Sequence, residues 1–557
     1  MEAELNSEIR VSLTEKWEAG EQFLFTLRLG EVLFHRQWTE YSGLNERQQH
    51  AFRFYWETDL AQIGGGETVA AGSLLETDEY FHPISYEVFS DRLPLQSAVF
   101  KEQSTEVTLA DDSTFALSLT STPDFVLQYN VLSQIGLFLS TFVPGQSPMI
   151  EATYFSPESF VARQMNFERV SQETGAAGVK WNTSLGAELV CDDDNRLRQV
   201  VIAKSNVSGE FERAPFPNLD FPSLRTPRLA AYKPPVNATF KLEEVTFPTD
   251  DEVDVRATIT IPSATAEKKH PGFLFIQGSG RHDRHGMAPG IDTGIHKIAD
   301  YLSNNGYVGL RFDSRGSGGT RYGQLLEMRY ETLINDAKAA FGLLRQRPEV
   351  REQELFIIGH SLGALTALHL ALDIDKLPIK GLVLLAPPGR PFDQIVTQQA
   401  LREAQRLGFS REQIAERRRS LRDFFRRLKK GQLEESGGSP ASLSGVNANI
   451  LRQLMQIDPA QLLVKELVPI LICQGWKDIQ VSVEDDTLRL VRAAAAAPQA
   501  INLEARIFTN LDHLFKVESA SPSPERYYVD RPTGADFLKS LLFWLNGQTA
   551  PSQARAP

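Results

Sequence analysis

One short stretch constrains the fold of this chain more than any other: residues 354–373, ELFIIGHSLGALTALHLALD. An apolar run, Leu355 to Ile358, leads into Gly359-His360-Ser361-Leu362-Gly363, and a second apolar period starts immediately afterwards. The first run has the length of a buried strand, and the second has the spacing of a helix. A strand followed at once by a helix, across a turn rich in small residues, is typical of a βα unit in a parallel sheet.

The second half of the chain repeats this alternation, which predicts βαβ units around a mainly parallel sheet. The expected fold class is α/β, with a helical lid insertion at about 393–463 whose basic helix opens with a capping box at Ser410 and Gln413. The closing helix is expected at 534–546. The other expected helices are 292–306, 331–347 and one that starts at 362. The expected strands are 240–248, 254–262, 272–280, 307–313, 354–359, 381–387, 468–475 and 501–508.

The first 213 residues follow a different pattern, with apolar and polar residues in alternation. EQFLFTLRLG (21–30) alternates, with Phe23, Phe25, Leu27 and Leu29 on one face, and TEVTLADDSTFALSLT (105–120) alternates on both sides of a turn signal. Many such strands predict a separate, mostly-β N-terminal domain, either an open barrel or a sandwich. A proline-rich linker is expected at 214–238, an α/β domain at 239–547 and a disordered tail at 548–557.

Composition excludes several classes of protein. The formal net charge of −13 argues against nucleic acid as a partner, and the two cysteines exclude a disulfide framework or a cysteine zinc site. No run approaches the ~18 apolar residues of a membrane span, and 131–143 is expected to be a buried helix. The charged N-terminus predicts a cytoplasmic protein as written, or an exported one if Met1 replaces a removed signal peptide.

The turn at Ser361 is the candidate catalytic centre. Gly-x-Ser-x-Gly between a strand and a helix raises the serine above the sheet, because side chains at Gly359 and Gly363 would collide where the two elements meet. The N–H of Leu362 then lies at a helix N-terminus, where unpaired donors favour an anion. We therefore expect Ser361 to be a nucleophile and Leu362 to be an oxyanion donor.

A nucleophilic serine needs a base and a group that orients the base. In this fold the partners follow in the order serine, acid, histidine. Asp478 follows the apolar run 468–475 and is the expected acid, with Asp485 and Asp486 as alternatives. His513 is the histidine beyond the last expected strand and is the expected base.

A second oxyanion donor is expected in the small loop QGSG, 277–280. The N–H of Ser279 is the first choice and that of Gly280 the alternative; Ser279 is also a weak rival nucleophile. Asp313 and Arg315, in DSRGSGG, are expected to form an ion pair with each other. Neither glycine-bearing stretch completes a phosphate-binding fingerprint, and the histidines show no metal-ligand spacing, so no cofactor or metal is expected.

Residues 240–547 resemble the α/β-hydrolase fold, and within it the bacterial serine esterases related to dienelactone hydrolase and the prolyl-oligopeptidase catalytic domain. The resemblance implies Ser361 as nucleophile, Asp478 as acid and His513 as base. This chain departs from the pattern at Gln277, where relatives often have histidine, and at Asp512, where they often have asparagine. The tail KVESASPSPERYYVDRPTG is also longer than expected. The first 230 residues resemble no family; their strand pattern is only loosely like open β-barrel lipid-binding domains. The stretches that carry the resemblance are GSGRHDRHG, LRFDSRGSGG, IIGHSLGALTAL, LLAPPGRP, QGWKDIQVSVEDD and NLDHLFK.

These observations predict a serine hydrolase that cleaves a small-molecule or lipid-like carboxylic ester through an acyl-enzyme, with no nucleic acid partner. A peptidase, thioesterase or acyltransferase would use the same triad, because the fold does not choose the bond. A protein of another class, which binds a lipid or polymer and carries a vestigial hydrolase domain, is the third alternative. The N-terminal half and the helical insertion are expected to shape or cover the pocket.

Overall fold

The structure is a computed structural model, and it describes most of residues 10–549. Part of the proline-rich linker, the turn at 110–113 and the residues from 550 onward lie outside the described residues. Most of the predicted disordered tail, 548–557, is therefore not described, but its first two residues are not disordered as predicted, because they end the last helix. The gaps within the described range are 60–67, 91–94, 110–113, 120, 129–131, 144–147, 158–160, 171–177, 185, 204–206, 226–231, 264–268, 281, 289–290, 322, 324–327, 373–376, 407–408, 432–447, 524–525 and 528.

The chain forms two compact units, which are described separately below. The first comprises residues 1–227 with 404–445, and the second comprises 228–403 with 446–557. The expected division, with 239–547 as one domain that includes the insertion, remains a proposal.

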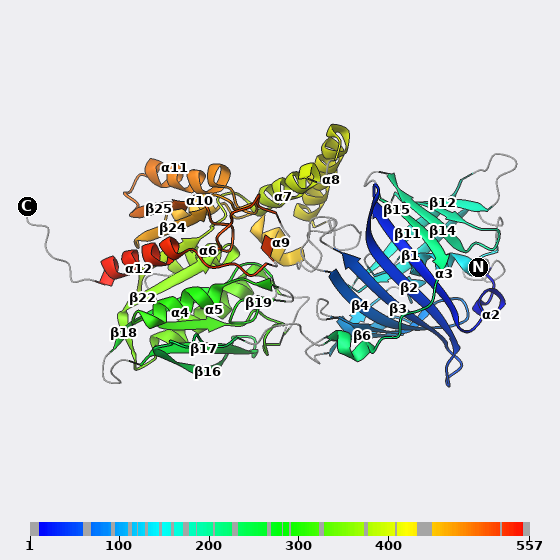
Figure 1. The fold of residues 1–557 in the computed structure, drawn as a ribbon, viewed down its shortest axis with the longest axis horizontal. Helices are drawn as coiled ribbons and strands as arrows, with labels where there is room; N and C mark the ends of the chain where they lie inside the picture. Colours follow the sequence, from blue (N-terminus) through cyan, green and yellow to red (C-terminus); the bar gives the residue numbers. More distant parts are fainter. Residues whose placement is uncertain are drawn as a thin grey trace, which may run out of the picture. The chain divides into compact units, whose positions relative to one another are not determined.

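The N-terminal half is mostly β, as predicted, and its strands form one sheet (Figure 1). Among the described residues the sheet has 15 strands in the order β8-β7-β6-β5-β4-β3-β2-β1-β15-β14-β13-β12-β11-β10-β9. The strands pair antiparallel, except for the short parallel pair β9–β10. The elements are α2 (Leu13–Lys16), β1 (Glu21–Leu29), β2 (Val32–Leu44), β3 (His50–Asp59), β4 (Thr68–Thr77), β5 (Pro83–Phe89), β6 (Leu95–Lys101), β7 (Ser104–Leu109), β8 (Thr114–Ser118), β9 (Phe125–Val126), α3 (Ser133–Ser140), β10 (Met149–Ser156), β11 (Val161–Arg169), β12 (Val179–Thr183), β13 (Glu188–Cys191), β14 (Leu197–Ile202), β15 (Val207–Arg213) and the 3-10 helix η3 (Phe221–Arg225).

The sheet curls around helix α3. Strands β6 and β10 are far apart in the strand order, yet Phe100 and Phe155 make an edge-to-face contact with ring centroids 5.3 Å apart. Every residue of α3 is buried, and Phe138 stacks on Phe125 of β9. The apolar stretch at 131–143 is therefore a buried helix, as predicted, and one curled sheet fits an open barrel better than a two-layer sandwich.

The C-terminal half contains an eight-stranded sheet in the order β16-β17-β21-β18-β22-β23-β24-β25. The strands from β21 to β25 run parallel, and β16 and β17 are antiparallel at one edge. This confirms the predicted α/β fold. The strands are β16 (Phe240–Pro248), β17 (Asp254–Pro262), β18 (His270–Ile276), β21 (Val308–Phe312), β22 (Val350–His360), β23 (Ile379–Leu385), β24 (Ile470–Gly475) and β25 (Leu503–Phe508), with the separate pair β19 (Met287–Ala288) and β20 (Ile291–Asp292).

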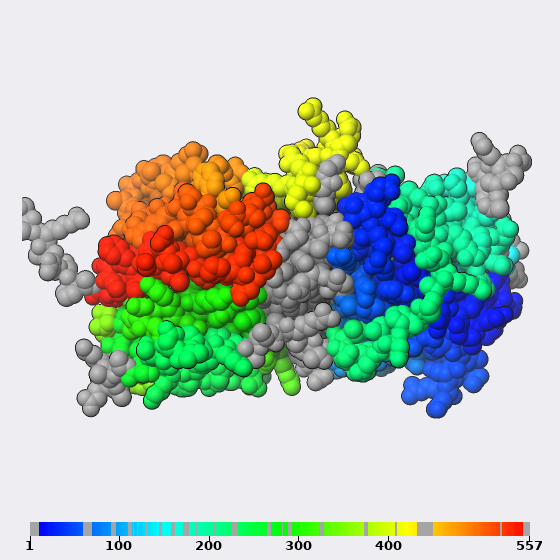
Figure 2. Space-filling view, in the orientation of Figure 1, coloured from blue at the N-terminus to red at the C-terminus, as the bar shows by residue number. Residues whose placement is uncertain are grey.

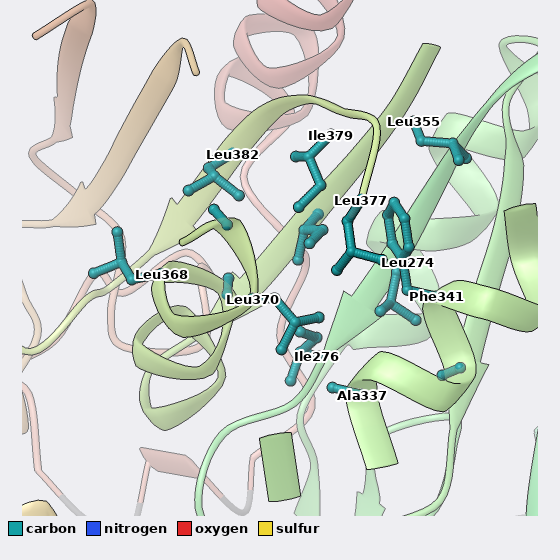
Figure 3. Packing of buried hydrophobic residues seen from close by; sticks show 14 of the residues in the cluster. Leu274, Ile276, Ala337, Phe341, Leu355, Leu368, Leu370, Leu377, Ile379 and Leu382 are labelled. Atoms are coloured by element: carbon teal, nitrogen blue, oxygen red, sulfur yellow. The ribbon is translucent and has the colours of Figure 1, made fainter. Parts of the chain in front are cut away.

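Two apolar cores lie on the two faces of this sheet, because alternate strand residues point to opposite faces. On one face, Ile276 and Leu355 pack with residues of α5 and α6, as Figure 3 shows around Phe341 and Leu368. On the other face, Phe356 packs with α4 and α12. The helices are α4 (Ile295–Asn304), α5 (Tyr330–Arg345), α6 (Leu362–Ala371), α7 (Phe392–Arg406), α8 (Arg411–Lys429), α9 (Ala448–Leu454), α10 (Pro459–Leu463), the π-helical turn η6 (Val483–Thr487), α11 (Leu488–Ala496) and α12 (Ala535–Thr549).

The predicted helical insertion between β23 and β24 is present as α7 to α10. The capping box of α8 is formed as expected: the Ser410 side chain accepts from the Gln413 N–H, and the Gln413 side chain accepts from the Ser410 N–H. Leu421, Phe425 and Leu428 are buried, while much of the arginine-rich opposite face is exposed (Figure 2, yellow). Within the described part of the chain, no helix is both long enough and apolar enough to cross a membrane.

Candidate active site

Ser361 lies in a strained turn between β22 and α6. Its φ of 52° and ψ of −118° are unfavourable for a residue with a side chain, and its N–H donates to the Leu385 carbonyl, 2.8 Å away. The strain is tolerated because the strand before it and the helix after it are both buried. The turn therefore holds the serine at the carboxyl end of the central strand, as the sequence predicted.

Glycine is required on both sides of Ser361. A Cβ at Gly359 would lie 2.3 Å from the Gly363 carbonyl oxygen, and a Cβ at Gly363 would lie 2.2 Å from the Ile276 carbonyl oxygen. Both contacts are with backbone atoms, which cannot move aside. The two glycines allow α6 to start directly against the ends of β18 and β22.

Asp478 follows β24 and has a buried carboxylate with four hydrogen-bond donors. Its Oδ2 accepts from His513 Nδ1 at 2.7 Å and from Gln474 Nε2 at 2.8 Å. Its Oδ1 accepts from the N–H groups of Gln480 and Val481. These four bonds fix the orientation of the carboxylate.

The predicted base, His513, is buried in the turn after β25 and donates from Nδ1 to Asp478. A neutral imidazole with its proton on Nδ1 has a lone pair on Nε2, which can accept the proton of a hydroxyl. The alternative acids have other partners: Asp486 pairs with Arg390, and Asp485 accepts from Gln398. Among the carboxylates of the described residues, Asp478 is the one hydrogen-bonded to His513.

His360, directly before Ser361, connects the serine turn to the base. Its Nε2 lies 2.8 Å from the His513 carbonyl oxygen, and the two imidazole rings have centroids 4.8 Å apart. Burial, and then the neighbouring His513, lower the pKa of His360 to about 3. A neutral His360 that donates from Nε2 holds the His513 backbone beside Ser361. Sequence reasoning missed this contact, although His360 lies inside the serine motif.

The loop after β18 lies against the serine turn. A Cβ at Gly278 would be 3.2 Å from the Ser361 Cβ and 3.2 Å from His360 Nδ1. The loop is held from behind, since Gln277 Nε2 donates to the carbonyls of Asp283 and Phe312. The Ser279 carbonyl is 3.0 Å from His282 Nε2. The loop thus lies against Ser361, and the roles of the Ser279 N–H, and of the Leu362 N–H at the start of α6, as oxyanion donors remain predictions.

The expected pairing of Asp313 with Arg315 is wrong. Asp313 pairs with Arg284, and burial raises the pKa of Asp313 to about 6. Arg315 instead pairs with Asp251 and Asp336. The turn between Asp313 and Arg315 directs their side chains to different partners. Among the described residues, no group of three or more His, Cys, Asp or Glu side chains could hold a metal ion.

Comparison with known proteins finds a family and a relative that are similar to this chain. A family described as serine aminopeptidase, S33, matches residues 284–518. Esterase EstD of Thermotoga maritima is 25% identical over 287 residues, which is 52% of this chain and 64% of that relative. The match thus spans less than two thirds of EstD.

Similar solved structures cover mainly the C-terminal half. The Pyrococcus furiosus esterase PF2001 is 17% identical, with a TM-score of 0.38 over 58% of this chain and 97% of that one. Acetyl xylan esterase 1 from a Thermoanaerobacterium species is 14% identical, with a TM-score of 0.37 over 58% of this chain and 88% of that one.

Proposed function

We propose that this chain, whose C-terminal half is an α/β-hydrolase, is a serine esterase that cleaves carboxylic esters through an acyl-enzyme. The observation that carries the proposal is the buried Asp478–His513 pair, which His360 ties to the turn of Ser361. This arrangement supplies a nucleophile, a base and a group that orients the base. The similarity to an esterase supports the choice of ester.

In the proposed mechanism, Ser361 Oγ attacks the acyl carbonyl and His513 Nε2 takes the hydroxyl proton. Asp478 keeps the other imidazole proton on Nδ1 and stabilises the positive charge that forms on the ring. The N–H groups of Leu362 and Ser279 donate to the oxyanion. His513 then gives its proton to the leaving alcohol oxygen as the acyl C–O bond breaks.

The acyl-enzyme is resolved by water in the reverse sense. His513 removes a proton from water, the hydroxide attacks the acyl carbon, and Ser361 leaves with the proton returned by His513. The products are a carboxylic acid and free enzyme. The proposed substrate is a small-molecule or lipid-like ester, and no step needs a cofactor.

Two assays test the proposal. We expect hydrolysis of p-nitrophenyl esters to exceed that of peptide anilides and acyl thioesters. Activity confined to the anilides would favour a peptidase instead, the alternative to which the serine aminopeptidase family description points.

Labelling by a fluorophosphonate tests the nucleophile. We expect the wild-type chain to be labelled and Ser361→Ala not to be labelled, with Ser279→Ala as the matched control that keeps the label. Equal labelling of wild type and Ser361→Ala would exclude Ser361 as the nucleophile. If neither chain is labelled and no acyl substrate is cleaved, a binding protein with a vestigial hydrolase domain becomes the better description.

A further inference from the structure

The segment after His513 folds back onto the turn that carries this histidine. The Val517 N–H donates to the Pro532 carbonyl at 2.9 Å, and the Gly534 N–H donates to the Phe515 carbonyl at 2.9 Å. An isolated β-bridge between Lys516 and Thr533 joins the same two stretches of the chain. The unusually long segment 516–534 is thus tied at both ends to the turn of the proposed base.

Asp512 closes this turn with its side chain and its backbone. Its Oδ1 accepts from the N–H groups of Leu514 and Lys516, at 2.9 and 3.0 Å. Its backbone N–H donates to the Lys516 carbonyl at 3.1 Å, and its carbonyl accepts from the Phe515 N–H at 3.1 Å. Four hydrogen bonds therefore surround His513, and all four depend on the residue that precedes it.

The other oxygen of Asp512 is paired with an arginine from the returning segment. Arg531 Nη2 lies 2.6 Å from Asp512 Oδ2, and Arg531 Nη1 lies 3.0 Å from Glu518 Oε2. The three residues are 7%, 2% and 1% exposed for Arg531, Asp512 and Glu518. Glu518 has a second partner, Arg526, at 2.9 Å. Among the described residues, Arg531 is the one recorded ion-pair partner of Asp512.

We propose that Arg531 and Asp512 are positioning residues for His513, which hold its turn and keep the carboxylate beside it electrically neutralised. This inference rests on the proposed function for the role of His513 as base, but the contacts themselves do not. A buried carboxylate next to an imidazole favours the protonated ring unless a cation compensates it. Arg531 supplies that cation to Asp512.

The charges around the Arg531–Asp512 ion pair determine in which direction each substitution should shift the titration midpoint of His513. Removing Arg531 leaves Asp512 without its arginine, while Glu518 keeps Arg526. Removing the charge of Asp512 leaves Arg531 still paired with Glu518, so that change perturbs His513 less. The titratable and charged groups that face His513, Asp512 or the pair are Asp478, His360, Lys516, Glu518, Arg526 and Tyr527.

The test compares wild type with Arg531→Gln, Asp512→Asn, the double variant and Arg531→Lys. The readout is the titration midpoint of the His513 ring by NMR of ¹³Cε1-labelled histidine, assigned with His513→Gln, together with the pH profile of kcat/KM on a p-nitrophenyl ester. We expect Arg531→Gln to move the midpoint and the acid limb about half a pH unit upward. This lowers kcat/KM by about threefold on the acid side.

The other variants separate electrostatics from folding. We expect Asp512→Asn to move the midpoint slightly downward, and the double variant and Arg531→Lys to remain close to wild type. Arg347→Gln is the matched control, since Arg347 pairs with Glu243 at 2.6 Å in the loop before β22; it should move neither readout. A midpoint that stays at the wild-type value in Arg531→Gln would overturn the inference. A shifted midpoint in a chain that cleaves no ester would overturn the proposed function alone.

Discussion

At the scale of single residues, the Asp478 carboxylate gives the sharpest prediction. Asp478→Asn keeps the shape of the side chain, but its amide presents a donor where His513 Nδ1 also donates, so the wrong imidazole tautomer is favoured. We expect kcat on p-nitrophenyl esters to fall roughly 10⁴-fold, as tautomer loss does in serine hydrolases. Steady-state kinetics checks this.

Asp485→Asn is the matched control for Asp478→Asn. Asp485 lies in the same strand-to-helix region but accepts from Gln398 and has no recorded contact with His513. Its substitution should leave kcat within about twofold of wild type, because surface changes away from the site have small effects. A large loss in Asp485→Asn, with a small loss in Asp478→Asn, would reassign the acid.

The candidate site was accessible from the sequence because chain order restricts its members. Ser361 is marked by its turn, and Asp478 and His513 each follow a recognisable apolar strand. The contacts that support them were not accessible. Arg531 is one of many arginines in a loop without periodicity, and nothing local shows that it reaches Asp512 in the folded chain.

At the scale of elements, the junction of β22 and α6 predicts a contrast between two glycines. Gly359→Ala places a Cβ 2.3 Å from a backbone oxygen, so β22 and α6 must separate; we expect a loss of several kcal/mol in the free energy of unfolding or no soluble protein. Gly342→Ala, inside α5 with no atom within 4 Å of the new Cβ, should gain roughly 0.5–1 kcal/mol. Urea denaturation measures both.

The contrast would fail if Gly359→Ala were as stable as wild type. In that case the strand and the helix would not meet as closely as the contacts at Gly359 and Gly363 require. Gly342→Ala is the matched control, because it makes the same chemical change at a helix position where the new Cβ has space.

Elements themselves follow from local pattern, whereas their partners do not. Alternation predicted β1, and the spacing of apolar residues predicted α6 and the buried face of α8. Strand β1 pairs with β15, whose residues lie more than 170 positions later in the chain. Alternation gives the buried face of a strand but not its neighbour, which explains why the N-terminal domain was predicted as β without a topology.

At the scale of the whole molecule, the chain forms two compact units, so we expect more than one unfolding transition. Because titratable groups are buried in the second unit, we expect its free energy of unfolding to pass through a maximum as the pH is varied. Burial lowers the pKa of His285 and His360 to about 3, so their contribution is present above the unfolded pKa near 6.5 and is lost as pH falls toward 3. The acid side of the stability profile therefore declines through protonation of these histidines.

The alkaline side of the stability profile of the second unit depends on Glu466, which lies between α10 and β24 and is 3% exposed. Burial raises the pKa of Glu466 to about 8, so its contribution is fully present below pH 4.5 and is lost as pH rises through 8. Glu466→Gln removes this loss, because glutamine stays neutral. We expect the variant to match wild type near pH 4.5 and to gain on the order of 1 kcal/mol per pH unit above it, up to about pH 8. Urea-dependent hydrogen exchange in β24 measures the second unit by itself, with Glu352→Gln, a change in the exposed pair with Arg345, as the control that stays flat. If the free energy of unfolding of Glu466→Gln changes with pH in parallel with that of wild type, Glu466 is already ionised in the folded unit.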